Sequence, residues 1–185
     1  MALNTVIQLL QNRVSCPKLV APAPNQDELN AILGCAMRAP DHGRLKPWLY
    51  HVIQGDALVK LGDVFVQALD GQNVANDKIE KTRNIPLRAP LLIVAVCEPQ
   101  ANAKVPAMEQ VLAVGAGIQN MQVAISSLGY GSIWRTGQMA HADVVKQAFN
   151  VSEQGEIVGF LYVGTPEKTP NKPAADIEQY VKYWE

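Results

Sequence analysis

Charged side chains are scarce in this sequence: Asp, Glu, Lys and Arg make up 18% of its 185 residues, against about 25% in an average soluble domain. The 16 basic and 17 acidic residues leave a formal net charge of −1, and no block of like charges occurs. Proteins that bind nucleic acid or an anionic membrane carry a basic patch, so neither partner is expected. A low charge content is also consistent with surface that a second copy of the chain covers.

Cysteine is rare as well. Cys16, Cys35 and Cys97 are odd in number, lie in different segments and show no CxxC spacing, which excludes a disulfide framework and a zinc motif and favours a reducing compartment. No signal-peptide pattern is evident at the start of the sequence. The most apolar run, residues 89–97, is much shorter than the roughly 20 residues of a membrane-spanning helix. We therefore expect a cytoplasmic protein that does not cross a membrane.

Motifs of common enzyme classes are missing too. The sequence has no GxSxG, no P-loop and no HExxH, so hydrolase and metalloenzyme functions have no support. The three histidines are scattered; we expect His51 at the surface or as a satisfied core residue, and His141 at the surface. Gly115-x-Gly117 lies inside a helix pattern and lacks the third glycine of a dinucleotide fingerprint. We interpret these glycines as a place where another helix approaches closely.

Apolar periodicity predicts one domain, residues 1–185, in which helices outnumber strands and separate them, an α+β or α/β arrangement. Residues 89–97 are apolar on both faces, as in a central strand covered on both sides. Residues 108–128 predict a long helix buried on most sides, of the kind found in cores or dimer interfaces. Further helices are predicted up to Asn12, from a capping box at Asn25 and Glu28 to before Pro40, at 58–69, in part of 70–84, at 143–149 and at 177–183; further strands at 49–54, 131–135 and 157–163, the last ended by 164–166.

Three polar loops at the ends of these elements are candidate ligand sites, since ligand contacts concentrate in such loops. In the first, Arg13 and Ser15 can bind a phosphate through charge-assisted hydrogen bonds, or Arg13 can serve as a helix C-terminal charge. In the second, residues 38–43, composition alone favours a surface turn in which Asp41 caps its own backbone.

The third loop, residues 129–137, contains Trp134 and Arg135 with a hydroxyl and flanking glycines. This combination suits a flat aromatic ligand with an anionic tail, and it equally suits a core tryptophan beside a solvated arginine. The chain offers binding groups and a covered sheet but no nucleophile. Such a set is what a cofactor-driven redox enzyme needs, because the cofactor carries the chemistry.

Four blocks of this sequence together resemble the FMN-dependent nitroreductase family, specifically its compact bacterial branch of NAD(P)H nitroreductases. They follow the family's order and span nearly the whole chain. The blocks are Asn-Arg-Val-Ser at 12–15, Arg-Ala-Pro-Asp-His at 38–42 with Pro-Trp at 47–48, Gly-Tyr-Gly-Ser-Ile-Trp-Arg-Thr-Gly at 129–137, and Ile-Val-Gly-Phe-Leu-Tyr-Val-Gly-Thr-Pro at 157–166.

The resemblance implies an α+β fold with a mostly antiparallel sheet flanked by helices, and a homodimer with the long helix at its interface and two FMN molecules bound there. It implies hydride transfer from NADH or NADPH through FMN to a nitroaromatic, a quinone or a similar acceptor, by a ping-pong mechanism with no protein acid or base. It assigns FMN contacts to Arg13, Val14, Ser15, Trp134, Arg135 and Thr136, and, from the partner subunit, to Arg38 and His42. It assigns nicotinamide nucleotide contacts, by a weaker transfer, to Ala124, Ile125, Ser126, Ser127, Leu128 and Gly129.

Two departures from the family pattern bear on cofactor and substrate binding. Val14 replaces the second arginine of the family's Arg-Arg-Ser segment, so this position offers only backbone contacts to a phosphate. Residues 43–46 replace a loop that carries an asparagine in larger members, which affects the flavin edge and substrate choice. The chain after Pro166 is short, so a long C-terminal extension around the partner is not expected. Alternatives are an FMN-dependent reductase or dehydrogenase acting on another metabolite, and a flavin-binding or redox-sensing protein without turnover.

Overall fold

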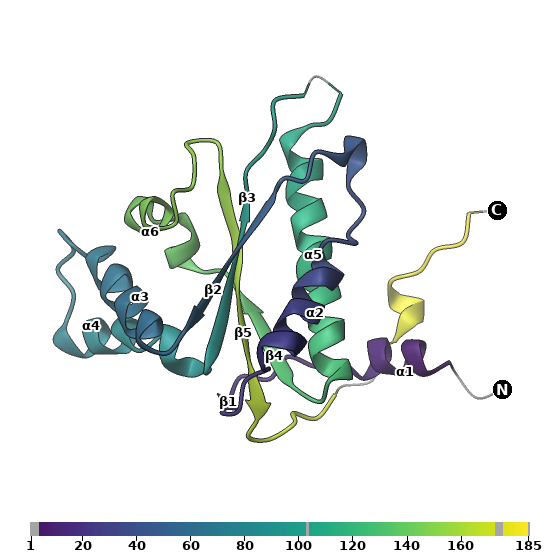
Figure 1. The fold of residues 1–185 in the computed structure, drawn as a ribbon, viewed down its shortest axis with the longest axis horizontal. Helices are drawn as coiled ribbons and strands as arrows, with labels where there is room; N and C mark the ends of the chain where they lie inside the picture. Colours follow the sequence, from purple (N-terminus) through teal and green to yellow (C-terminus); the bar gives the residue numbers. More distant parts are fainter. Residues whose placement is uncertain (1–3, 103, 173–175, 185) are drawn as a thin grey trace.

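A five-stranded sheet forms the centre of the protein, between α3, α4 and α6 on one face and α2 and α5 on the other (Figure 1). The fold is that of a computed structural model, which describes residues 4–102, 104–172 and 176–184. The strand order is β1–β5–β3–β2, with β4 also paired to β5, and each of these pairings is antiparallel. The strands are β1 (Leu19–Val20), β2 (Trp48–Gln54), β3 (Leu91–Cys97), β4 (Gly131–Arg135) and β5 (Glu156–Pro166). The α+β class is confirmed.

The helices follow the predicted pattern closely. The capping box at the start of α2 is present: the Asn25 side chain accepts from the backbone N–H of Glu28, whose carboxylate accepts from the backbone N–H of Asn25. The helices are α1 (Thr5–Asn12), α2 (Gln26–Ala36), α3 (Asp56–Gln67), α4 (Asn76–Arg83), α5 (Ala107–Ser127) and α6 (Asp143–Ala148), with 3₁₀ turns η1 (His42–Arg44), η2 (Pro86–Arg88), η3 (Gln138–His141) and η4 (Ile177–Gln179).

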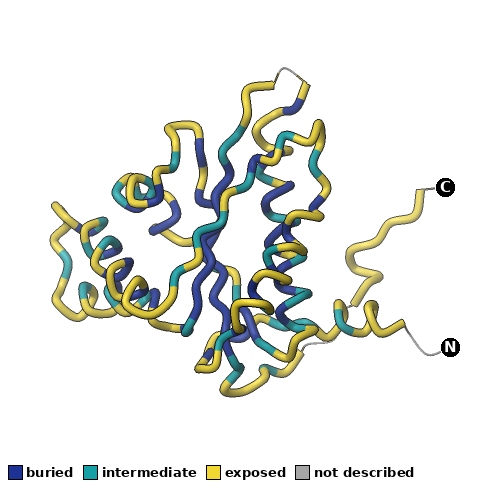
Figure 2. Tube along the Cα trace, in the orientation of Figure 1, coloured by how far each residue is buried: buried dark blue, intermediate teal, exposed yellow. Residues whose placement is uncertain are grey.

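The strand β3 is the middle of the core, as its sequence predicts. All seven of its residues are fully buried, and the dark strands at the centre of Figure 2 include it. Alternate side chains serve two cores: Val94 packs in the cluster with Phe65 of α3, whereas Ile93 packs in the cluster with Ile118 of α5. A strand covered by helices on both faces needs apolar residues at every position, which explains the unbroken run.

Three expectations about local structure need correction. The strand β5 continues to Pro166 instead of ending at Val163, because the short strand β1, which was not predicted, pairs with Thr165 and Pro166. The C-terminal helix expected at 177–183 is only the single turn η4. His51 is not a satisfied core residue: its ring packs on Phe149, and its Nε2 is buried without a hydrogen-bond partner.

The two glycines of α5 serve different contacts. At Gly117 a Cβ would overlap the hydroxyl of Tyr50 in β2 and would lie 3.4 Å from the carbonyl oxygen of Ala36, so this glycine makes room for β2 as well as for α2, the helix approach that was predicted. At Gly115 a Cβ would instead lie 3.6 Å from Cη2 of Trp134. Residues two apart on a helix point about 200° apart. Trp134 and α2 therefore lie on opposite sides of α5.

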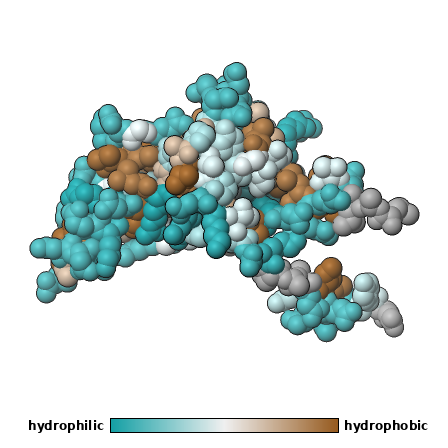
Figure 3. All heavy atoms as spheres, turned by 90° about the horizontal axis from the view of Figure 1, so that it is seen from below, coloured by the Kyte–Doolittle hydropathy of each residue, from teal (hydrophilic) through white to brown (hydrophobic). Residues whose placement is uncertain are grey.

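Much apolar surface remains exposed around α5. The helix α1 and residues 176–184 lie away from the sheet on this side of the molecule (Figure 1), and the terminal segment stands off as a separate lobe in Figure 3. Within the described ranges, no helix has the length and apolar character needed to cross a membrane. The largest exposed apolar side chains here are Val6, Ile7, Leu10, Met108, Leu112, Ile177, Tyr180, Tyr183 and Trp184. Because residues 1–3, 103, 173–175 and 185 lie outside the described ranges, one domain over 1–185 stays a prediction.

Candidate functional site

The structure brings the first and third polar loops together. Ser15 forms a parallel bridge with Ser132 of β4, and the backbone N–H of Cys16 donates to the Ser132 carbonyl oxygen over 2.9 Å. Residues 13–15 therefore lie along the outer edge of β4, whose inner edge pairs with β5. Two segments that are far apart in the sequence share one edge of the sheet.

This outer edge of β4 is open beyond Ser132. Because the Ser132 carbonyl points outward to Cys16, and backbone groups alternate along a strand, the N–H and C=O groups of Trp134 also point outward. No strand pairs with β4 on this side among the described residues. Unpaired backbone groups at a strand edge can bind the polar rim of a flat ligand.

Trp134 is held firmly in a slot between β5 and α5. Its Nε1 donates to the Val158 carbonyl oxygen over 3.2 Å, and a Cβ on Gly159 would overlap the indole. The slot is completed by Gly115 of α5. The side chain is nevertheless 37% exposed, so it combines the two alternatives considered for it: the indole is packed, and part of it is free to contact a ligand.

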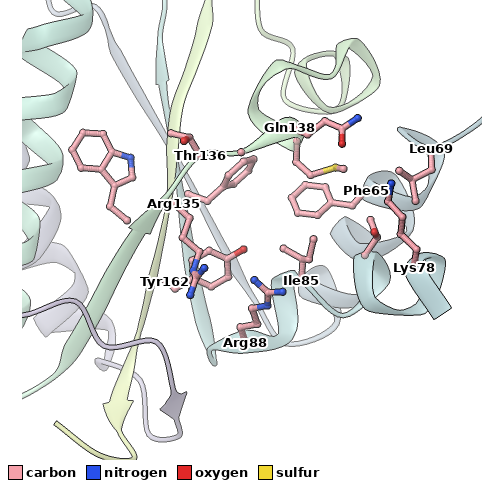
Figure 4. Close-up of a pocket in the computed structure, with 14 residues that line it drawn as sticks. Phe65, Leu69, Lys78, Ile85, Arg88, Arg135, Thr136, Gln138 and Tyr162 are labelled. Carbon is pink, nitrogen blue, oxygen red and sulfur yellow. The ribbon is translucent and has the colours of Figure 1, made fainter. Parts of the chain in front are cut away.

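Arg135 points to the other face of the sheet, into a cavity of about 560 Å³ between β4, β5 and the helices α3 and α4 (Figure 4). Lys78 and Arg88 also line this cavity, and within the described part of the chain none of the three cations forms an ion pair. Phe65 and Phe160 supply aromatic walls. The cavity suits a flat ring with an electron-rich edge.

Tyr162 lies close to two of these cations. Burial raises the pKa of its phenol to about 12, although the nearby guanidinium groups of Arg88 and Arg135 oppose this shift. The phenol is therefore a neutral hydrogen-bond donor at neutral pH, close to two positive charges. Arg88 and Lys78 were missed in the sequence, because only the pairing of β3 and β4 to opposite edges of β5 places Arg88 near Arg135.

Arg13 and Lys172 form a second basic region. Its Nη1 is buried and has no hydrogen-bond partner, and Arg13, Ser15 and Lys172 line one depression of about 440 Å³. The Lys172 ammonium donates to Oδ1 of Asn12, 160 residues away in the sequence, over 3.3 Å. A buried guanidinium N–H without an acceptor is costly, so this corner is prepared for an anion. Lys172 was also missed, since the C-terminal segment carried no pattern that relates it to α1.

The remaining positions in these segments lie as follows. Val14 packs against the core, so only its backbone is free for a ligand. Thr136 is exposed at the end of β4 and lines the cavity with Arg135. In the segment 124–129, Ile125 is fully buried, whereas Ser127 at the end of α5 and Leu128 and Gly129 in the following turn are exposed. A nucleotide site at 124–129 stays a prediction.

The second polar loop is not part of this site within one protomer. Its turn η1 lies beside the first turn of α5, where His42 Nδ1 is 2.7 Å from a carboxylate oxygen of Glu109. As predicted, the Asp41 side chain caps its own loop, accepting from the backbone N–H of Lys46 over 2.8 Å. Trp134 contacts α5 at Gly115, on the side away from α2. Arg38 and His42 therefore lie apart from Trp134 within one protomer, and their contact with a flavin stays a prediction.

The donor set of the site is basic and aromatic, without carboxylates. Within the described ranges, no group of three or more His, Cys, Asp or Glu side chains could hold a metal ion. The orphaned Arg13 Nη1, the open edge of β4 and the cations of the cavity fit a phosphorylated ligand with a flat, electron-accepting ring.

Comparisons with known proteins identify the family of this chain. The family model described as "Nitroreductase family" matches residues 10–165. The chain is 42% identical over 161 residues to "Putative NAD(P)H nitroreductase YdjA" of Escherichia coli K12, covering 87% of this chain and 88% of that protein. It is 33% identical over 181 residues to "Putative NAD(P)H nitroreductase" of Haemophilus influenzae, covering 96% of this chain and 98% of that protein.

Solved structures share the fold. A nitroreductase-like family protein from Bacillus cereus superimposes with a TM-score of 0.84 at 22% identity, covering 100% of this chain and 98% of that one. A nitroreductase with bound FMN from Bacteroides fragilis superimposes with a TM-score of 0.75 at 18% identity, covering 99% and 100%. With the family model and two relatives above 30% identity, the conclusion is plain: the chain belongs to the nitroreductase family.

Proposed function

We propose that this protein is an FMN-dependent oxidoreductase that takes a hydride from NADH or NADPH and reduces a nitroaromatic, a quinone or a similar acceptor. The observation that carries the proposal is Arg13, whose Nη1 is buried without a partner and which lines one depression with Ser15 and Lys172. Relatives named as NAD(P)H nitroreductases support the donor, and FMN-bound members of the fold support the cofactor. The cytoplasmic location expected from the three cysteines belongs to the same proposal.

Two groups of residues would hold the two ends of the cofactor. Arg13, Ser15 and Lys172 would hold its phosphate, and the outward backbone of Trp134 and Thr136 would meet the rim of its ring. Bound FMN supplies the redox chemistry, accepting the hydride and passing electrons to the acceptor in a ping-pong cycle. Cations at the ring stabilise the negative charge that reduction adds, a role that Arg88 and Arg135 would share. The chain needs no catalytic acid or base for the hydride step.

A homodimer completes the proposal. The apolar residues Met108 and Leu112 of α5 are 67% and 63% exposed, and a monomer rarely leaves such a patch open. Tyr180, Tyr183 and Trp184 are 84%, 88% and 101% exposed. We infer that this short tail packs on the partner, although a long C-terminal extension around the partner is not expected. In such a dimer Arg38 and His42 of one subunit would reach the FMN of the other.

The first experiment is an absorption spectrum of the purified protein with FMN, before and after anaerobic addition of NADPH or NADH. The proposal requires an FMN complex whose flavin bleaches with at least one nucleotide and recovers its colour on adding a nitroaromatic or quinone. Failure to bind FMN refutes it. Binding without reduction by either nucleotide favours a flavin-binding protein without turnover.

Sharing of the site between subunits has its own test. Arg13→Ala disables a subunit's own phosphate site, whereas His42→Ala disables its contribution to the partner. Random mixing makes about half of the dimers mixed, and each mixed dimer keeps one intact site of two, so about a quarter of wild-type turnover should return. If both residues served the same subunit's site, no mixed dimer would hold an intact site and no activity would return.

A further inference from the structure

Glu109 and His42 form a close pair between two elements that are distant in the sequence. The turn η1 places His42 Nδ1 at 2.7 Å from Oε2 of Glu109 in the first turn of α5, and the two residues are 67 positions apart. An ionised carboxylate can only accept a hydrogen bond. Nδ1 must therefore carry the proton, which leaves Nε2 as the nitrogen that is available to other molecules.

The loop around His42 has a side-chain hydrogen bond and left-handed backbone. Asp41 accepts from the backbone N–H of Lys46 over 2.8 Å and closes the turn. Gly43 has a φ of 75° and Arg44 a φ of 54°, in the left-handed region that non-glycine residues rarely adopt. Such backbone persists where the surrounding structure determines it, and it concentrates at functional sites.

The pair also faces the surface that the proposed dimer would bury. Glu109 is adjacent to Met108, and both it and His42 are exposed in one protomer, with side chains 46% and 60% accessible. The charges close by on the loop are Arg38, Asp41, Arg44 and Lys46, which line a neighbouring depression of about 290 Å³. Among the described residues none of these four forms an ion pair with His42 or Glu109, so the two side chains pair only with each other.

We propose that Glu109 is a positioning residue for His42: it holds the proton on Nδ1 and turns Nε2 across the dimer interface toward the partner's flavin. This inference rests on the proposed function for the identity of the ligand. It adds a residue outside the flavin site that decides which nitrogen of His42 meets that ligand. Second-sphere carboxylates act on histidines in this way at metal sites, where losing them costs about 10- to 100-fold in function.

The direct test is the tautomer of His42 in the protein without added FMN, measured by long-range ¹H–¹⁵N NMR above about pH 8, where an ordinary histidine is neutral. The chain has three histidines, so the spectrum of His42→Asn identifies the signal. We expect Nδ1 to be protonated in the wild type and in Glu109→Gln, whose amide oxygen still accepts. In Glu109→Ala the proton should move largely to Nε2. A wild-type His42 protonated on Nε2, or a tautomer that Glu109→Ala leaves unchanged, overturns the proposal.

Turnover of the FMN-loaded dimer supplies the second readout. Glu109→Ala should lower kcat by about 10-fold, in line with second-sphere losses, while Glu109→Gln restores most of it and the KM for the nucleotide changes little. The matched control is Glu153→Ala, an exposed glutamate in the turn after α6, which should leave both constants unchanged. A changed tautomer with unchanged turnover refutes the positioning role but leaves the proposed function intact. Failure of the wild type to bind FMN refutes the proposed function, while the NMR result still shows whether Glu109 sets the tautomer of His42.

Discussion

Removing the charge of Arg13 should affect the free protein and the FMN complex in opposite directions. In the protein alone, Nη1 of Arg13 is buried without a partner, and such a group costs about 1–3 kcal/mol. Arg13→Met keeps the apolar stem and removes the unpaired donor. We therefore expect the free energy of unfolding without FMN to stay the same or to rise by about 1 kcal/mol.

The FMN complex should weaken instead. A hydrogen bond to a charged group contributes about 1.5–3 kcal/mol, so Kd should rise by about 10- to 150-fold. At an FMN concentration of about 100 times the wild-type Kd, the wild type gains about 2.7 kcal/mol of stability, and the variant should gain only about 0.3–1.4 kcal/mol. Urea unfolding with and without FMN measures both effects, and a fluorescence titration measures Kd.

The matched control is Lys60→Met, which removes an exposed cation of α3 far from the phosphate corner. It should leave the FMN affinity unchanged, which separates a specific phosphate contact from a general loss of positive charge. If Arg13→Met destabilised the free protein by more than about 1 kcal/mol and bound FMN as tightly as the wild type, the guanidinium would have a structural role and the phosphate assignment would be wrong.

Three further predictions concern the packing of Trp134, the burial of His51 and the C-terminal tail. Gly159→Ala should displace the indole of Trp134, since its Cβ would overlap Nε1; we expect the free energy of unfolding in urea to fall by about 1–3 kcal/mol and the tryptophan emission to change. The control Gly34→Ala, in a helix with open space around it, should be neutral or stabilising. A neutral Gly159→Ala would mean that the slot around Trp134 is not tight. Burial lowers the pKa of His51, so the unfolded state binds more protons and the free energy of unfolding should fall as the pH decreases below about 6.5. His51→Gln should make this dependence on pH less steep, and His141→Gln should not. The same dependence in the wild type and both variants would argue against a contribution from His51. Removing residues 176–185 should weaken the dimer in sedimentation at micromolar concentration, and a truncated chain that associates as strongly as the full one would exclude a role for the tail.

The sequence by itself determined most of the secondary structure and the central strand. The capping box at Asn25 and the unbroken apolar run of β3 are local signals, because each depends only on residues that are close together in the sequence. The resemblance in four short blocks pointed to the family before any fold was known. The predicted end of β5 was wrong for a physical reason. The last residues of β5 pair with β1, and this long-range contact leaves no local pattern in residues 164–166.

Only the tertiary structure decided how the candidate site is assembled. The bridge from Ser15 to Ser132 sets the phosphate corner beside β4, and the order of the strands brings Arg88 to Arg135. Lys172 reaches α1 from the far end of the chain, and Glu109 meets His42 across 67 residues. Each of these contacts depends on where the sheet and α5 place segments that have no sequence relation to one another. The residue types at the site were visible in the sequence, but their partners are a product of the fold.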